Sequence, residues 1–232
     1  MEPTRLDKRL SALLGIPRGE ARRYIEGGWV SVDGEVVEQP QRPVDDSASI
    51  VVAEQASDSK AERASMLLHK PAGVPADALC ALIRTETRSE LDASDIRPLQ
   101  RHFHGLQLAS SLPADDNGLV VVSQDPAVLA HLQRNLGRTE QEYLVEVAEG
   151  GPERGPWLMA RLQHEAGGPK VSWQSEQRLR FAGKGLTAKG LRTAVTAAGL
   201  QAVAVRRLRI GRVALGPLAV GQWRYLGSDE RF

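Results

Sequence analysis

The chain has 232 residues, enough for one large domain or for a large and a small one, and its composition (41% hydrophobic, 25% charged) is that of an ordinary globular protein. No apolar run approaches the length of a membrane span, and the opening residues MEPTRLDKRL lack a secretory core. We therefore expect a cytoplasmic protein without a membrane partner.

The first fifty residues predict two short helices followed by a small sheet. Leucines recur at helical spacing between residues 6 and 14, and Gly15 ends that helix. A second helix is expected through residues 17–25, where Gly27-Gly28 stops it. The stretch WVSVDGEVV alternates apolar residues around Asp33-Gly34, which is a strong hairpin signal.

A polar stretch, residues 54–65 (EQASDSKAERAS), is typical of a linker and separates domains at 1–53 and 66–232. In the second domain SMLLHKPAGV, GLVVVSQ, EYLVEVAE and AVAVRRLRIGRV predict strands, and PAVLAHLQRNL and KGLRTAVTAAG predict helices. Because strands and helices interleave without regular βαβ spacing, we expect an α+β fold with a mixed, largely antiparallel sheet and flanking helices.

Positive charge gathers near the end of the chain although the net charge is only +1. No acidic residue occurs between Gln177 and Ser228. Such a stretch favours binding of a polyanion, and the alternative is a solvated basic face balanced by acids elsewhere in the fold. The residues of this basic strip are Arg178, Arg180, Lys184, Lys189, Arg192, Arg206, Arg207, Arg209, Arg212 and Arg224.

The stretch RLDKRLSALLGIPRGEARRYIEGGWVSVDGEVV resembles the alpha-L RNA-binding domain named from ribosomal protein S-four. The resemblance implies that the two helices and the following turn present basic side chains to structured RNA. The alternative is an amphipathic helix pair whose arginines merely face water. The residues that the resemblance assigns to RNA are Arg5, Lys8, Arg9, Arg18, Arg22 and Arg23.

The rest of the chain resembles the bacterial ribosomal-RNA pseudouridine synthases that join this domain to a catalytic domain. LLHKPAGV is similar to the family's L-N-K-P-x-G-V turn, and EQEYLVEV to its E-K-x-Y-x-V strand, which places Tyr143 on the family tyrosine. KGLRTAVTAAG is similar to the R-Q-V-R-R-M helix and keeps Lys189 and Arg192. RRLRIGRVALGPLAVGQWRYL is similar to the closing strands.

The stretch SSLPADDNGL is similar to the family's active-site motif G-R-L-D-x-D-T-x-G-L, and Pro113 takes the place of its essential aspartate. In active relatives that carboxylate attacks the sugar of uridine or acts as a base on it, a tyrosine stacks on the flipped base, and a basic residue pairs with the carboxylate. Proline can do none of this. The reaction implied by the resemblance needs no metal and no cofactor.

Two neighbouring carboxylates could replace the missing one. Asp115 lies two residues further on, roughly 6 to 7 Å along an extended chain, and Asp116 should point differently again. If either is catalytic, Asp115, Tyr143 and Arg192 are the site residues that we expect. At three positions of the helix that is similar to R-Q-V-R-R-M and of the residue before it, the family has an asparagine, a glutamine and a second arginine. This chain has Ala188, Gly190 and Thr193 there, which favours loss of catalysis.

Metal binding has little support in the sequence. His102 and His104 are two residues apart, but nothing nearby completes a ligand set. The single cysteine, Cys80, excludes an internal disulfide and makes a cysteine-based zinc site equally unexpected.

The leading hypothesis is a monomeric, cytoplasmic protein on a pseudouridine synthase scaffold that binds structured, ribosomal RNA and is catalytically inactive. Its RNA contacts are expected from the helix pair and from Lys189, Arg192, Arg206 and Arg207. The rival is an active pseudouridine synthase that uses Asp115 or Asp116. A third reading, a protein-interaction module that has lost RNA binding, is the weakest because the basic residues persist.

Overall fold

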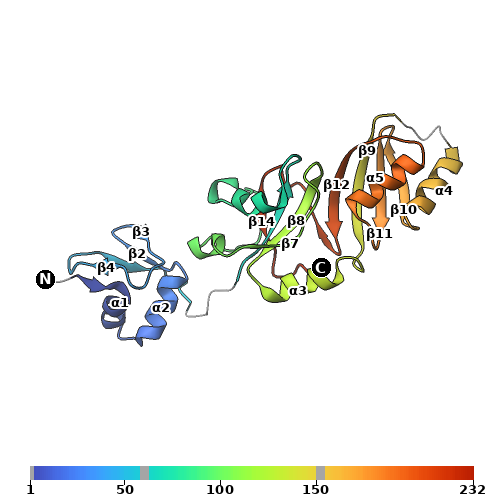
Figure 1. The fold of residues 1–232 in the computed structure, drawn as a ribbon. Coiled ribbons are helices and arrows are strands. Elements are labelled where there is room, and N and C mark those ends of the chain that lie inside the picture. Colours follow the sequence, from blue (N-terminus) through green and yellow to red (C-terminus); the bar gives the residue numbers. More distant parts are fainter. Residues whose placement is uncertain (1–2, 58–62, 150–154) are drawn as a thin grey trace. The chain divides into compact units, whose positions relative to one another are not determined.

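The computed structural model describes residues 3–57, 63–149 and 155–232, which form two compact units (Figure 1). The first unit comprises the chain up to Arg63 together with Arg97–His104, and the second comprises Ala64–Ile96 and Gly105–Phe232. Residues 58–62 of the expected linker lie outside the described part of the chain.

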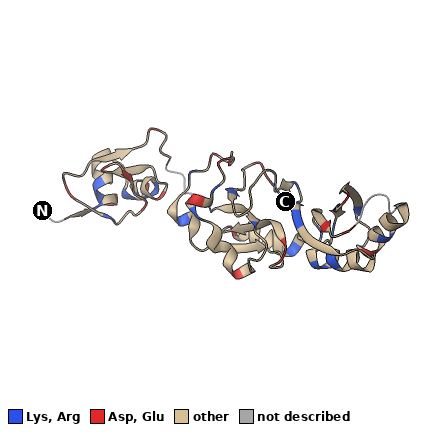
Figure 2. Cartoon of the chain, turned by 90° about the horizontal axis from the view of Figure 1, so that it is seen from above, with Lys and Arg blue, Asp and Glu red and all other residues tan. Residues whose placement is uncertain are grey.

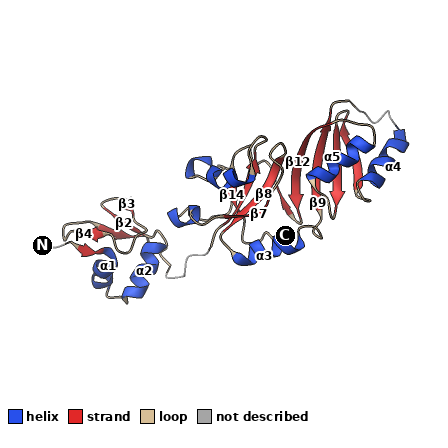
Figure 3. Cartoon of the chain, viewed as in Figure 1, coloured by secondary structure: helices blue, strands red, loops and turns tan. Residues whose placement is uncertain are grey.

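In the first unit the two expected helices and the hairpin are present (Figure 3). Gly15 ends the first helix in the left-handed conformation, at φ 67°, and the hairpin turns at Asp33-Gly34, both with positive φ. β1 pairs with β4, and β2 lies between β3 and β5. The elements are β1 Thr4–Arg5, α1 Leu6–Leu14, α2 Arg18–Glu26, β2 Val30–Val32, β3 Glu35–Val36, β4 Pro43–Val44 and β5 Ile50–Val52.

The segment Arg97–His104 belongs to this first unit although it lies far along the chain. The Arg97 guanidinium lies 5.4 Å from the ring centre of Trp29, and the backbone N–H of Gln100 donates to both carboxylate oxygens of Glu38 at 3.0 and 2.8 Å. Leu99 is buried against Gly28, where a Cβ atom would stand 2.8 Å from its side chain. The absence of a side chain at Gly28 therefore leaves room for the side chain of Leu99, and Gly28 also stands just after the end of the second helix.

The second unit is built on one mixed sheet. In the described residues the strand order is β10-β11-β9-β12-β8-β6-β14, with β13 paired to β12 and β7 paired to β8. Only β8 and β12 run parallel among these pairs. The strands are β6 Ser65–Lys70, β7 Gln107–Ser110, β8 Asn117–Ser123, β9 Gln141–Val147, β10 Lys170–Ser175, β11 Arg178–Gly183, β12 Ala202–Ile210, β13 Val213–Ala214 and β14 Trp223–Tyr225.

Helices cover this sheet and bury its apolar face. α3 packs on β7 and β8, α5 packs on β9 and β12, and α4 packs on α5 and β10 (Figure 1). The core includes Leu67, Leu119, Val121 and Leu132. The helices are α3 Pro126–Asn135, α4 Gly155–Glu165 and α5 Ala188–Ala197, and short 3-10 turns cover Ala76–Leu82, Thr85–Thr87 and Gln100–Phe103.

The expected α+β class with a largely antiparallel sheet is confirmed. The four expected strands of the second domain and both of its expected helices are present. The sequence analysis did not find α4 or the hairpin made by β10 and β11.

Candidate functional site

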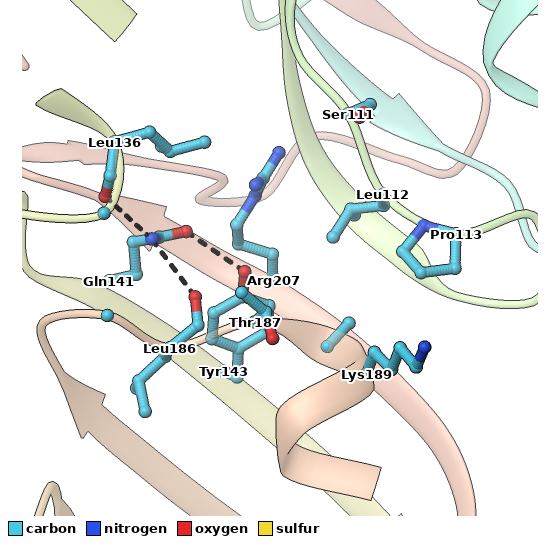
Figure 4. A pocket seen from close by; sticks show the side chains of 13 residues that line it. Ser111, Leu112, Pro113, Leu136, Gln141, Tyr143, Leu186, Thr187, Lys189 and Arg207 are labelled. Carbon is cyan, nitrogen blue, oxygen red and sulfur yellow. Dashed lines mark hydrogen bonds between the residues drawn. The ribbon is translucent and has the colours of Figure 1, made fainter. Parts of the chain in front are cut away.

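A cavity of about 200 Å³ opens beside the turn between β7 and β8 (Figure 4). Pro113 lines it from that turn, and Tyr143 lines it from the middle of the sheet. The whole site belongs to the second unit. Its lining residues are Ser111, Leu112, Pro113, Leu136, Gly137, Gln141, Tyr143, Gly185, Leu186, Thr187, Ala188, Lys189 and Arg207.

Tyr143 is held rigidly in the floor of the cavity. Its hydroxyl donates to Gln141 Oε1 at 3.0 Å, and Gln141 Nε2 donates to the carbonyls of Leu136 and Leu186 at 3.1 and 3.3 Å (Figure 4). Burial raises the pKa of Tyr143, and the neighbouring Arg207 guanidinium opposes that rise. The tyrosine is therefore a neutral, oriented ring at neutral pH.

Arg207 projects from β12 and is only 2% exposed. Its Nε donates to the carbonyl of Leu119 at 2.7 Å, and Nη2 donates to the Ser110 hydroxyl at 3.0 Å. Burial lowers the pKa of Arg207, while Tyr143 opposes the shift; an arginine still keeps its charge in a protein. Within the described residues no carboxylate forms an ion pair with it.

Gly118 makes this placement of Arg207 possible. The two residues are opposite each other in the parallel pair of β8 and β12. Gly118 has φ 112°, and a Cβ atom there would lie 2.3 Å from the carbonyl oxygen of Arg207. The glycine of SSLPADDNGL thus lets the two strands approach closely at the site.

Arg192 pairs with Asp116 and not with any residue of the cavity wall. Both Nε, at 3.1 Å, and Nη2 of Arg192 donate to Asp116 Oδ1, and Nη1 donates to the carbonyl of Ala202 at 3.3 Å. The Asp116 side chain is 1% exposed, and among the residues that the structure describes its Oδ2 has no hydrogen-bond partner. Asp115, in contrast, is exposed and does not line the cavity.

A buried lysine holds the turn that contains these aspartates. Lys70 Nζ donates to the carbonyls of Pro71, Ala114 and Asp116 at 2.8 to 2.9 Å. Burial lowers the pKa of Lys70, and the negative charges of Asp116 and Asp115 oppose that shift. Through these hydrogen bonds, the Lys70 ammonium joins its own turn, HKPAG, to the turn between β7 and β8 that contains the two aspartates.

The sequence analysis missed Lys70, Gln141 and Thr187. A signal existed for Gln141: it lies two residues before Tyr143 in a strand, so both side chains share one face, and both are buried. Thr187 caps α5, because its hydroxyl accepts from the backbone N–H of Gly190 at 3.0 Å. Lys70 lies in a motif that the sequence analysis used only as a landmark.

In the first unit the expected RNA-binding cations lie on and beside α1 and α2. Asp7, buried between the helices, accepts from Arg5 at 3.0 Å and from Arg18 at 2.9 Å. Both arginines remain about half exposed, since each side chain has a relative exposure of 51%. Lys8 is exposed, Arg9 pairs with Asp46, Arg22 pairs with Glu26, and Arg23 is half-buried.

The basic strip is less positive than its sequence suggests, because glutamates in and beside β9, together with Glu230, neutralise much of it. Arg180 binds Glu142 at 2.6 Å, and Arg209 binds both Glu140 and Glu142. Arg178 pairs with Glu146 and Arg224 with Glu230. The alternative of a basic face balanced by acids elsewhere therefore applies to these residues.

Four cations of the basic strip stay exposed without an ion pair in the described part of the chain, and Figure 2 shows the basic residues on the second unit. Arg207 is not among them, because it is buried. Arg192 is half-buried in its pair with Asp116. The four are Lys184, Lys189, Arg206 and Arg212.

No group of three or more potential metal ligands occurs in residues 3–57, 63–149 and 155–232. Over the same residues no helix has both the length and the apolar character of a membrane span. His102 is buried and His104 is exposed.

Comparison with known proteins agrees with both units. A family model for the S4 domain matches residues 4–50. The chain is 27% identical over 235 residues to an uncharacterized RNA pseudouridine synthase of Aquifex aeolicus (strain VF5), covering 97% of this chain and 94% of that protein. A crystal structure of a pseudouridylate synthase matches with a TM-score of 0.56 at 20% identity, covering 96% of each chain.

The chain therefore carries an S4 domain at its N-terminus, and it has the fold of the pseudouridine synthases. Its likeness to the Aquifex protein extends over nearly the whole length of both. These findings support RNA binding on a pseudouridine synthase scaffold.

Proposed function

We propose that this protein binds structured, ribosomal RNA on a pseudouridine synthase scaffold and does not isomerise uridine. The observation that carries the proposal is the position of Pro113, which lines the cavity beside Tyr143 and Arg207. In the resemblance described above, this is the position of the essential aspartate. Proline supplies neither a nucleophile nor a base there.

Neither neighbouring carboxylate supplies the missing group in this geometry. Asp115 is exposed and lies outside the cavity wall. Asp116 is buried, and the arginine that should pair with the catalytic carboxylate, Arg192, is bound to it. A reacting group must be held within about 0.5 Å of its productive position, so a carboxylate that does not line the cavity cannot take over the reaction without a rebuilt turn.

RNA binding is assigned to two surfaces, each on its own unit. On the S4 domain the exposed side chains of Arg5, Lys8, Arg18 and Arg22 supply the contacts. On the second unit the contacts come from the exposed cations Lys184, Lys189, Arg206 and Arg212. Positive charge of this kind binds the phosphate backbone. We further propose that the protein acts in the cytoplasm as a monomer.

One observation favours a second function, an active enzyme with a displaced aspartate. Asp116 and Arg192 form a carboxylate–arginine pair like the one that the family's reaction uses, and Asp116 Oδ2 is free of hydrogen bonds. A shift of the turn toward the cavity would present that oxygen to a sugar. This alternative predicts turnover by the unaltered protein.

Pseudouridine mapping in ribosomal RNA decides between the two functions. The RNA is incubated with the wild type, Pro113→Asp, Asp115→Asn and Asp116→Asn, and pseudouridine is located by mass spectrometry. We expect no turnover by the wild type and at most partial turnover by Pro113→Asp, since Ser111, Ala188, Gly190 and Thr193 leave a restored aspartate with few partners. Wild-type turnover that Asp115→Asn or Asp116→Asn abolishes would establish the enzyme instead.

A further inference from the structure

We propose that the cavity bounded by Pro113, Lys189 and Arg207 is a binding site for a phosphate group. This inference extends the proposed function, because it gives the same cavity a ligand in place of a reaction. It rests on the charges that line the cavity and can be tested without RNA.

The buried guanidinium of Arg207 is the first argument. It lines the cavity at 2% exposure and has no carboxylate partner in the described residues. Removing a charge from water without a counter-charge is costly. Two of its about five N–H donors bind Leu119 and Ser110, and Tyr143 lies beside it. The remaining donors suit an oxyanion, for which the arginine fork is well shaped.

A second cation lines the same cavity. The Lys189 side chain extends along the wall beside Pro113 (Figure 4), and it is exposed without an ion pair in the part of the chain that the structure describes. Among the residues that line the cavity none is acidic, so its lining carries two positive groups and no negative one. Arg207 is the group that would contact the anion, and Lys189 adds positive charge at the wall.

The start of α5 strengthens this preference for an anion. Thr187, Ala188 and Lys189 line the cavity, so the helix begins at its wall. The N-terminal end of a helix carries partial positive charge and favours phosphate. The Thr187 hydroxyl accepts from Gly190 N, which leaves its own proton to donate to a ligand.

The shape of the cavity limits the ligand. Its volume of about 200 Å³ is below the roughly 300–1,000 Å³ of pockets for drug-sized ligands. Leu112, Pro113, Leu136 and Leu186 give it apolar walls. A phosphate with its adjoining sugar fits these features, and the phosphate comes either from the RNA backbone or from a free phosphate ester.

The Pro113→Asp substitution is the sharpest test, because it places a carboxylate where the phosphate would bind and leaves both cations in place. Binding of inorganic phosphate is measured by isothermal titration calorimetry at constant ionic strength. We expect wild type and Pro113→Ala to bind phosphate, and Pro113→Asp to bind it at least about tenfold more weakly, the scale of one lost charge-assisted contact.

Lys189→Gln and Lys170→Gln form a matched pair of further variants. Lys189 lines the cavity and Lys170 does not, although both are exposed lysines of the second unit. Lys189→Gln should weaken phosphate binding, and Lys170→Gln should leave it unchanged. Equal binding by Pro113→Asp and wild type, or the absence of binding by wild type at millimolar phosphate, overturns the proposal.

Two further ligands identify the source of the phosphate. Ribose 5-phosphate offers a free monoester, and a diribonucleotide whose only phosphate is a diester represents the RNA backbone. Preference for the first assigns the site to a small phosphate ester, and preference for the second assigns it to RNA. Loss of phosphate binding with RNA binding intact refutes the site alone, whereas phosphate binding without RNA binding refutes the proposed function alone.

Discussion

Asp7 shows how one buried carboxylate can hold together a surface that we propose binds RNA. Its own burial would raise the pKa of Asp7, but hydrogen bonds and charges from Arg18 and Arg5 outweigh burial and hold the pKa below its ordinary 3.8. The folded state therefore binds this proton less readily than the unfolded chain does. The resulting stability is present above about pH 4 and is lost as the pH falls through the folded-state pKa.

The Asp7→Asn variant should lower the free energy of unfolding of the first unit by on the order of 2 kcal/mol at pH 7, because two arginines lose a buried counter-charge. Asp46→Asn, which removes a solvent-exposed pair with Arg9, should cost less than about 1 kcal/mol. Urea unfolding of both variants checks this prediction. Equal losses of unfolding free energy in the two variants would mean that burial of Asp7 does not strengthen its ion pairs with the two arginines.

Gly118 is the residue at which the backbone of the site has least freedom. In Gly118→Ala the new methyl group would meet the Arg207 backbone and the φ of 112° would be strained. Gly216→Ala is the control, because Gly216 also has positive φ (60°) but no atom within 4 Å of its Cβ position. We expect the control to lose about 1 kcal/mol and Gly118→Ala to lose several times more in thermal unfolding. Similar thermal unfolding midpoints for Gly118→Ala and Gly216→Ala would contradict the expected steric clash at Gly118.

At the site, a sequence motif can indicate where a residue lies, but it cannot show which of two neighbouring arginines is buried. Tyr143 could be placed from its motif, and it lines the cavity. Arg206 and Arg207 were both expected to face RNA, yet adjacent residues of a strand point to opposite faces, and Arg207 is the one that points inward. Which of the two is buried depends on how β12 pairs with β8, a strand far away in the sequence, and the sequence alone does not show that pairing.

At the scale of elements, strong periodicity decided what could be predicted. VVV in β8 and the alternation of β9 indicate strands without help from the rest of the fold. β10 is an edge strand and β11 lies between it and β9. The two strands have only a few buried residues, such as Leu179 and Phe181, so their sequence pattern is weak. α4 was not predicted because its sequence begins with Gly-Pro, a pair that is typical of a loop.

The segment Arg97–His104 should stabilise the S4 domain as part of its structure. Leu99→Ala removes a buried side chain packed on Gly28, and we expect a loss of about 2–4 kcal/mol in the first unit. Leu91→Ala is the control, since Leu91 is 65% exposed. Hydrogen exchange at α1 and α2 reports the effect directly, and unchanged exchange in Leu99→Ala would refute a stabilising role for this segment.

At the scale of the whole molecule, RNA binding should depend steeply on salt. Each phosphate that an exposed cation neutralises adds to the slope of log affinity against log salt. The double variant Lys8→Glu, Arg22→Glu should weaken binding to ribosomal RNA fragments by about tenfold or more and reduce that slope. Arg231→Glu, outside both proposed surfaces, is the control. Filter binding between low and moderate salt checks this, and a slope near zero would contradict backbone recognition.

Because residues 97–104 pack in the first unit, they also affect the order in which the parts of the protein can fold during synthesis. Domains generally fold as they leave the ribosome, N-terminal part first. Here the helix pair and its sheet emerge before Leu99 has been synthesised, so the surface around Gly28 and Trp29 stays uncovered while the second unit's first strand is already being made. The first unit can therefore complete its packing only after part of the second unit has been translated. A fragment that ends at residue 53 would leave exposed the surface that residues 97–104 cover.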